Sequence, residues 1–145
     1  MAKQVIVTGS SGIAAALIRA LNERGDLIYI MGGVDAESER LALECKNIKG
    51  FSSIYLRQED QVVNAFNEAK RVLLGITDVV GIVGGSGRKF GDARLDQISL
   101  DAWHRTLELN LSTAFLTLRE GINLLKNSGG SITLTGSVLA TSPVR

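Results

Sequence analysis

The chain has 145 residues, of which 45% are hydrophobic, and it carries sixteen basic and fifteen acidic side chains. That length suits a single domain with one substantial core, and the composition excludes extensive disorder. A net charge near +1 excludes the basic surfaces typical of nucleic-acid and membrane binding, and no apolar run approaches the roughly 20 residues that span a bilayer. Because Cys45 is the only cysteine, an internal disulfide is impossible. We therefore expect a cytoplasmic protein with no nucleic-acid or membrane partner.

Apolar runs alternate with helical patterns along the first third of the chain. The β-branched run at 4–8 predicts a strand buried on both faces, and the residues after it predict a helix over 12–24 with Gly25 as its C-terminal stop. A second strand is predicted at 27–31 and a short charged helix at 36–46. This order is typical of a strand–helix–strand unit with parallel strands.

The same alternation continues through the rest of the chain. The predicted elements are, in order, a strand at 53–56, a helix at 58–74, a strand at 78–83, a long helix capped by Ser99 and reaching about Lys126, and a strand at 131–135. No linker or repeat separates a second domain, so residues 1–145 are predicted to form one domain. The predicted fold class is α/β, a Rossmann-like doubly wound parallel sheet of about five strands in three αβα layers.

A glycine turn joins the first strand to the first helix in the run Val7-Thr8-Gly9-Ser10-Ser11-Gly12-Ile13. Such a turn aims backbone N–H groups and the positive end of a helix dipole at one place, which suits a phosphate or pyrophosphate. The glycine spacing alone is a weak signal, but its position inside a strand–helix–strand unit strengthens it. We predict that five residues of this turn bind the cofactor, namely Gly9, Ser10, Ser11, Gly12 and Ile13.

Glycines also follow other predicted strands, at 32–33, at 84–85 and at Gly136. Parallel strands place these ends on one edge of the sheet, where small residues let the backbone approach a ligand, although each glycine also suits an ordinary turn. We predict a nucleotide site there and assign Gly33, Gly84 and Gly85 to it. Asp35 either reaches the ribose hydroxyls of the nucleotide or caps the following helix. The strand end itself carries no carboxylate, which leaves both NAD and NADP open as cofactors.

Three segments resemble the short-chain dehydrogenase/reductase family. Residues 7–13 are similar to its cofactor loop, Leu107-Glu108-Leu109-Asn110-Leu111 resembles the helix segment that carries its asparagine, and residues 131–138 resemble the strand that delivers its active-site serine. The resemblance implies a nicotinamide cofactor, NAD or NADP, and hydride transfer to or from a small carbonyl or alcohol substrate. It also implies catalytic roles for Ser137, which would polarise the substrate oxygen, and for Asn110, which would hold a water that passes protons.

The chain departs from the family pattern in three places. Its glycine loop is one residue shorter than the usual opening, and Ile82-Val83-Gly84-Gly85 replaces the usual Asn-Asn-Ala-Gly, so the central sheet must be braced differently or more weakly. Counted from Ser137, the catalytic tyrosine and lysine of the family would fall beyond Arg145, and Tyr29 and Tyr55 lie in other predicted strands. We therefore expect the chain to be a fragment that is inactive alone. The alternative is a non-catalytic NAD(P)-binding regulator or sensor.

Asn110 and Ser137 also carry predictions that need no resemblance. The helical repeat places Asn110 on an apolar face, together with Trp103, Leu107, Ala114, Leu118 and Leu125. Burying an amide there without partners costs about 1–3 kcal/mol, so the Asn110 side chain is predicted to hold a backbone group or an ordered water. Ser137 has a purely local alternative to its active-site role, which is a hydrogen bond to nearby backbone.

The remaining residues predict no metal site and an oligomer. His104 is the only histidine, and no His, Cys or carboxylate cluster has the spacing of metal ligands. The long helix also carries Leu109, Phe115, Leu116 and Ile122 outside its main apolar face. A helix that is apolar on more than one side needs cover on more than one side, which predicts a homo-oligomer for the complete protein.

Overall fold

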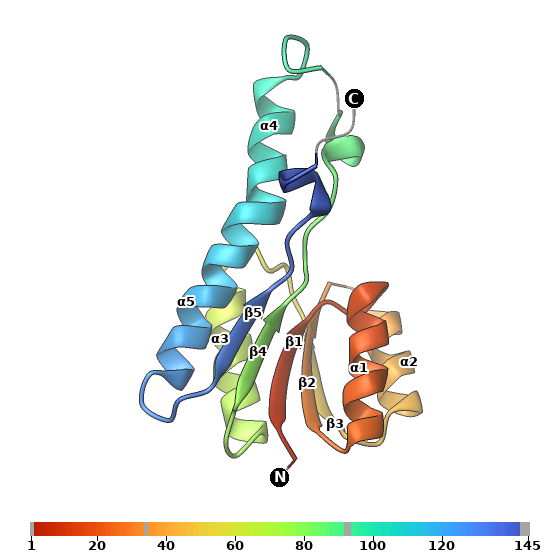
Figure 1. The fold of residues 1–145 in the computed structure, drawn as a ribbon, viewed down its shortest axis with the longest axis vertical. Coiled ribbons are helices and arrows are strands. Elements are labelled where there is room, and N and C mark those ends of the chain that lie inside the picture. Colours follow the sequence, from red (N-terminus) through yellow and green to blue (C-terminus); the bar gives the residue numbers. More distant parts are fainter. Residues whose placement is uncertain (1, 34, 92–93, 143–145) are drawn as a thin grey trace.

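A computed structural model describes residues 2–33, 35–91 and 94–142. Five parallel strands form one sheet in the order β3-β2-β1-β4-β5, as Figure 1 shows. The strands are β1 (Gln4–Thr8), β2 (Leu27–Gly32), β3 (Ile48–Ser53), β4 (Asp78–Gly81) and β5 (Ser131–Leu134). The predicted doubly wound parallel sheet is therefore confirmed, with its change of direction between β1 and β4.

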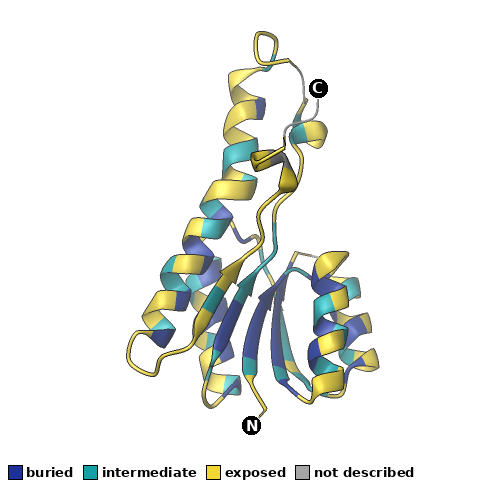
Figure 2. Ribbon diagram, viewed as in Figure 1, coloured by how far each residue is buried: buried dark blue, intermediate teal, exposed yellow. Residues whose placement is uncertain are grey.

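Helices cover both faces of the sheet. They are α1 (Ile13–Arg24), α2 (Asp35–Glu44), α3 (Glu59–Val72), α4 (Leu100–Leu107) and α5 (Thr113–Leu125). One apolar core lies between the sheet and α1 with α2, and a second lies between the sheet and α3 with α5. The central strands are dark blue in Figure 2, whereas α4 and the segments beside it are largely exposed. None of the helices in the described residues combines the length and apolar character that crossing a membrane requires.

The third strand was predicted wrongly, at 53–56, and it lies instead at Ile48–Ser53. Lys49 and Gly50 interrupt the apolar pattern of this segment and conceal the strand. Gly50 is required because the ring of Tyr29 on β2 packs over it, and a Cβ atom there would lie 2.9 Å from Tyr29 Cε2. Because β3 is the outer strand of the sheet, its position depends on its pairing with β2 more than on its own side chains.

The predicted long helix contains a break that the sequence did not indicate. Ser99 caps α4 as expected, because its Oγ accepts a hydrogen bond from Ala102 N at 3.1 Å. A π-helical turn, Glu108–Ser112, then separates α4 from α5. The extra residue of such a turn rotates the buried face, so the predicted apolar face is wrong in part. Trp103 and Leu118 are 45% and 38% exposed, while the buried positions of α5 include Thr113 and Thr117.

The Asp78 carboxylate holds the amino ends of β1, β4 and β5 together. It accepts hydrogen bonds from Lys3 Nζ at 2.8 Å, from Thr77 Oγ1 at 2.7 Å and from Ser131 Oγ. Burial by itself raises the pKa of Asp78, but the hydrogen bonds from Lys3, Ser131 and Thr77 outweigh it and hold the pKa below its ordinary value. A carboxylate with a lowered pKa stabilises the fold above the unfolded-state pKa, and that stability is lost as the pH falls through the folded-state value.

We expect Asp78→Asn to lower the free energy of unfolding at pH 7 by about 1–2 kcal/mol, because the amide loses the charge that three donors share. The difference from wild type should begin to shrink below about pH 4, where the carboxylate of the unfolded chain takes up a proton, and should shrink further as the pH falls through the lowered pKa of Asp78 in the folded state. Urea unfolding between pH 3 and pH 7 measures both effects. Asp96→Asn is the matched control, since Asp96 pairs with Arg94 in an exposed ion pair. A difference that does not depend on pH would contradict the role of the Asp78 charge.

Candidate functional site

Two adjoining cavities lie at the carboxyl ends of the strands, near the point between β1 and β4 where the strand order changes direction. The larger, of about 620 Å³, lies among the ends of β1, β4 and β5 and the helix face that carries Asn110 and Thr117. The smaller, of about 460 Å³, extends from the β1–α1 turn toward the β2–α2 turn. Ile13, Val83 and Gly84 belong to the walls of both cavities, so the two form one groove. We call it the edge groove.

The β1–α1 turn forms the middle of the edge groove. Gly9 has a φ of +102°, its N–H donates to Met31 O at 2.7 Å, and an added Cβ would lie 3.1 Å from Ala14 Cβ. Gly12, which precedes α1, has a φ of +53° and offers no capping side chain, and the first turn of α1 holds no acidic residue. The N-terminus of α1 therefore keeps its positive field available for an anion, as the glycine turn predicted.

Most of the predicted site residues lie on the edge groove. The smaller cavity is lined by Gly9, Ser10, Ser11, Ile13, Gly33 and Gly84, and the larger by Ile13, Gly84, Gly85, Asn110 and Ser137. Two predicted residues line neither cavity, namely Gly12, which begins the α1 helix, and Asp35, the exposed first residue of α2. Val34, the residue before α2, lies outside the described residues, so the capping alternative for Asp35 stays a prediction. The carboxylate that does line the smaller cavity is Glu37, which sequence reasoning missed.

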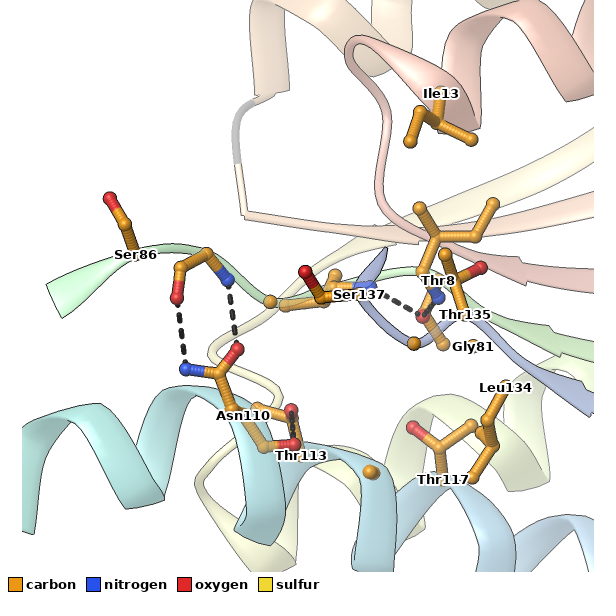
Figure 3. A pocket seen from close by; sticks show the side chains of 16 residues that line it. Thr8, Ile13, Gly81, Ser86, Asn110, Thr113, Thr117, Leu134, Thr135 and Ser137 are labelled. Carbon is orange, nitrogen blue, oxygen red and sulfur yellow. Dashed lines mark hydrogen bonds between the residues drawn. The ribbon is translucent and has the colours of Figure 1, made fainter. Parts of the chain in front are cut away.

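The Asn110 side chain clamps the loop after β4. Its Oδ1 accepts from Gly85 N at 2.9 Å, and its Nδ2 donates to Gly85 O at 3.0 Å and to Thr106 O at 2.9 Å. The two bonds to Gly85 are the dashed pair beside Asn110 in Figure 3. Thr113, the first residue of α5, likewise donates its Oγ1 hydrogen to Leu109 O in the π-helical turn, at 2.7 Å. The expectation that the Asn110 amide holds a backbone group is confirmed, whereas its catalytic role stays a prediction.

Thr8 holds the segment after β4, where the usual asparagines of the family pattern are replaced by Ile82 and Val83. It is buried at the end of β1, and its Oγ1 accepts a hydrogen bond from Ile82 N at 3.0 Å. This bond explains why β4 ends at Gly81, two residues before the predicted end, because the chain turns from the sheet to meet the Thr8 hydroxyl. Sequence reasoning missed Thr8. A threonine that ends a buried strand directly before the glycine turn is the signal that could have identified it.

Ser137 lies at the β5 end of the edge groove, together with Thr135 and Gly136. Thr135 N donates to Gly81 O at 2.9 Å, which fixes this segment beside β4. Neither tyrosine lies in the same cavity, since Tyr29 is buried with its hydroxyl 2.7 Å from Ser52 Oγ and Tyr55 is 60% exposed near β3. The residues that line the larger cavity supply hydroxyl, amide and backbone groups. They can polarise and orient an oxygen atom, but a proton donor must come from another group.

Other reactive side chains lie away from the edge groove. His104 is exposed on α4, and Cys45 is buried after α2, where burial raises the pKa of its thiol. Among residues 2–33, 35–91 and 94–142, no three His, Cys, Asp or Glu side chains gather where they could hold a metal ion. The edge groove is therefore the candidate functional site.

Comparison with known proteins gives consistent matches. The sequence model of a family described as short chain dehydrogenase matches residues 3–145. The D-beta-hydroxybutyrate dehydrogenase of Rhizobium meliloti (strain 1021) is 27% identical over 134 residues, which cover 89% of this chain and 51% of that protein. A solved alcohol dehydrogenase from the archaeon Thermococcus sibiricus, complexed with 5-hydroxy-NADP, superposes with a TM-score of 0.89 at 22% identity, over 99% of this chain and 62% of that one.

An NADH-dependent reductase, A1-R′, complexed with NAD, superposes with a TM-score of 0.85 at 20% identity, over 99% of this chain and 63% of that one. At these identities the two solved structures show the fold alone. The chain spans about half the length of the curated relatives that it matches, 51% and 57% in two cases.

Proposed function

The chain belongs to the short-chain dehydrogenase family, and from that premise we propose that the protein is an oxidoreductase that transfers a hydride between NAD or NADP and a small carbonyl or alcohol substrate. The observation that carries the proposal is the edge groove, which joins a glycine turn suited to an anion at Gly9 to a mainly apolar pocket that also holds the hydroxyl of Ser137 and the amide of Asn110. Similar structures complexed with NAD and with 5-hydroxy-NADP support both cofactors.

The residues of the groove fit a nicotinamide nucleotide. The glycine turn and the N-terminus of α1 hold its pyrophosphate, and the lack of side chains at Gly84 and Gly85 leaves room along its length. When bound, the nicotinamide supplies or accepts the hydride. Ser137 donates a hydrogen bond to the substrate oxygen, which stabilises the negative charge that develops there. Asn110 fixes the loop after β4, which lines both cavities, through its two hydrogen bonds to Gly85.

The proposal is tested with the protein at its native length, whose intact mass is compared with the 15.5 kDa of this chain. Isothermal titration with NADH and NADPH measures binding, and absorbance at 340 nm measures oxidation of either cofactor with a panel of small ketones. We expect binding and turnover. Binding without turnover on any ketone or secondary alcohol would favour a regulator that senses the cofactor, and absence of binding would overturn the proposal.

We also propose that the complete protein is a homo-oligomer that pairs through α5. Phe115, Leu118 and Ile122 of α5, with Leu111 of the π-helical turn before it, are all exposed, from 38% to 63%, and follow one another at intervals of four, three and four residues. That spacing is the seam by which two helices pack together. Analytical ultracentrifugation of the native-length protein should give a dimer or larger species, and a monomer at micromolar concentration would contradict the pairing.

A further inference from the structure

We propose that Ser38 is a positioning residue, which orients the hydroxyl of Ser10 toward the pyrophosphate of the bound nucleotide. The inference rests on the proposed function, because it concerns the binding of the same nucleotide. Ser38 is 0% exposed, and among residues 2–33, 35–91 and 94–142 its Oγ is the buried side-chain polar atom that has no hydrogen-bond partner. A buried hydroxyl without a partner costs free energy, so packing alone does not explain a serine at this position.

Ser38 lies on the face of α2 that packs against the sheet. The buried residues of α2 are Ser38 and Leu41, three positions apart, and Leu41 belongs to the apolar core between the sheet and α1 with α2. Alanine would occupy the place of Ser38 without burying a hydroxyl, and it also suits a helix better than serine does. The hydroxyl therefore stands where stability by itself favours an apolar side chain.

The Ser38 hydroxyl borders a small space at the end of β2. A Cβ atom added to Gly32 would lie 3.2 Å from Ser38 Oγ and 2.8 Å from Ser10 Oγ, so the two hydroxyls approach one point from α2 and from the β1–α1 turn. Gly32 is itself fixed in the sheet, because its carbonyl oxygen accepts a hydrogen bond from Ile54 N at 2.9 Å. The glycine thus leaves no side chain between the two oxygens.

Ser10 connects this space with the edge groove. It is 4% exposed, lines the smaller cavity and lies in the turn that leads from Gly9 to the N-terminus of α1. A serine hydroxyl donates one hydrogen bond and can accept others. When Ser38 donates to Ser10 Oγ, the Ser10 hydrogen is directed to a phosphate oxygen in the groove, and a bond to such a charged acceptor is stronger than one between neutral groups. Rotation of Ser38 about its Cα–Cβ bond changes the distance between the two oxygens without moving α2.

Isothermal titration of the native-length protein with NADH, NADPH and ADP tests this role. Ser38→Ala should weaken all three about tenfold, because each carries two linked phosphates and the Ser10 hydroxyl loses the group that orients it. Ser10→Ala should weaken them at least as much, and the double variant should lose no more than Ser10→Ala, since Ser38 acts through Ser10. Ser128→Ala is the matched control, because Ser128 is exposed after α5 and lines neither cavity.

Thermal unfolding without nucleotide separates positioning from packing. The Tm of Ser38→Ala should equal or exceed that of wild type, because alanine removes a buried hydroxyl that has no partner in the described residues. A residue that only supports the fold would give the opposite result. A fall in Tm that accompanies the loss of affinity would therefore overturn the inference.

The other outcomes distinguish the role of Ser38 from the proposed function. If wild type binds none of the three nucleotides, the proposed function fails and the inference fails with it. If wild type binds them but Ser38→Ala binds them equally well, the proposed function stands and the role of Ser38 is overturned. Losses that add in the double variant, or a loss confined to NADPH, would also overturn it.

Discussion

Gly9→Val should weaken the binding of a nicotinamide nucleotide by at least about a hundredfold, because this residue combines a strained backbone with a close approach. A φ of +102° is rarely adopted by residues with a side chain and costs of order 1–3 kcal/mol. The added Cβ would also lie 3.1 Å from Ala14 Cβ and 3.6 Å from Val83 Cγ2. The branched side chain would therefore displace the turn that is proposed to hold the pyrophosphate. Isothermal titration with NADH measures the loss.

The control for this variant separates backbone strain from the cofactor site. Gly25 also has a positive φ, +87°, and nothing lies within 4 Å of its added Cβ. It ends α1 at the helix terminus opposite to the groove. Gly25→Ala should lower the free energy of unfolding by about 1 kcal/mol and leave nucleotide binding unchanged. If Gly9→Val bound NADH as wild type does, the glycine turn would not be the pyrophosphate site.

The order of strands and helices could be predicted because the buried segments are apolar in sequence. β1 and β2 are buried on both faces and appear as unbroken apolar runs, and Gly25 and Ser99 mark helix ends through their own chemistry. The edge strand β3 was placed incorrectly because its position depends on the ring of Tyr29, which lies on another strand. The π-helical turn was missed because no glycine or proline marks it, and because the side-chain hydrogen bonds that Asn110 and Thr113 donate to the carbonyls of Thr106 and Leu109 leave no trace in the apolar pattern.

The residues of the candidate site also differ in how far local sequence indicates them. The glycine turn, Asn110 and Ser137 are carried by contiguous motifs and could be found in the sequence. Thr8 and Glu37 were missed, because their places in the groove depend on the register of neighbouring strands and on where α2 lies, and the local position of Thr8 before the glycine turn was the only sign of it in the sequence. Thr8 lies beside Gly81 only through the pairing of β1 with β4. The types of residue in the motifs indicated the chemistry of the candidate site. Which of several similar side chains lies in the groove depends on tertiary packing.

Asn110→Ala should lower kcat/KM of the native-length enzyme about a hundredfold, while it costs the fold only about 1 kcal/mol. The stability cost is small because Asn110 and Gly85 are exposed, so water can replace the lost hydrogen bonds. The activity cost is expected to be large because the clamp fixes the loop after β4, which lines both cavities of the proposed site, and small displacements of reacting groups slow a reaction strongly. Steady-state kinetics and urea unfolding measure the two effects. Asn123→Ala, at an exposed position on α5, is the matched control.

Gly84→Ala tests the same clamp from its other side. The added Cβ would lie 2.8 Å from Asn110 Oδ1, with no positive φ to add strain, so it displaces the amide that Asn110→Ala removes. If the clamp is the unit that matters, each single variant loses most of the activity and the double variant loses little more, since residues that share one interaction are not additive. Additive losses of kcat/KM would mean that Asn110 acts on the reaction through something other than its hold on Gly85.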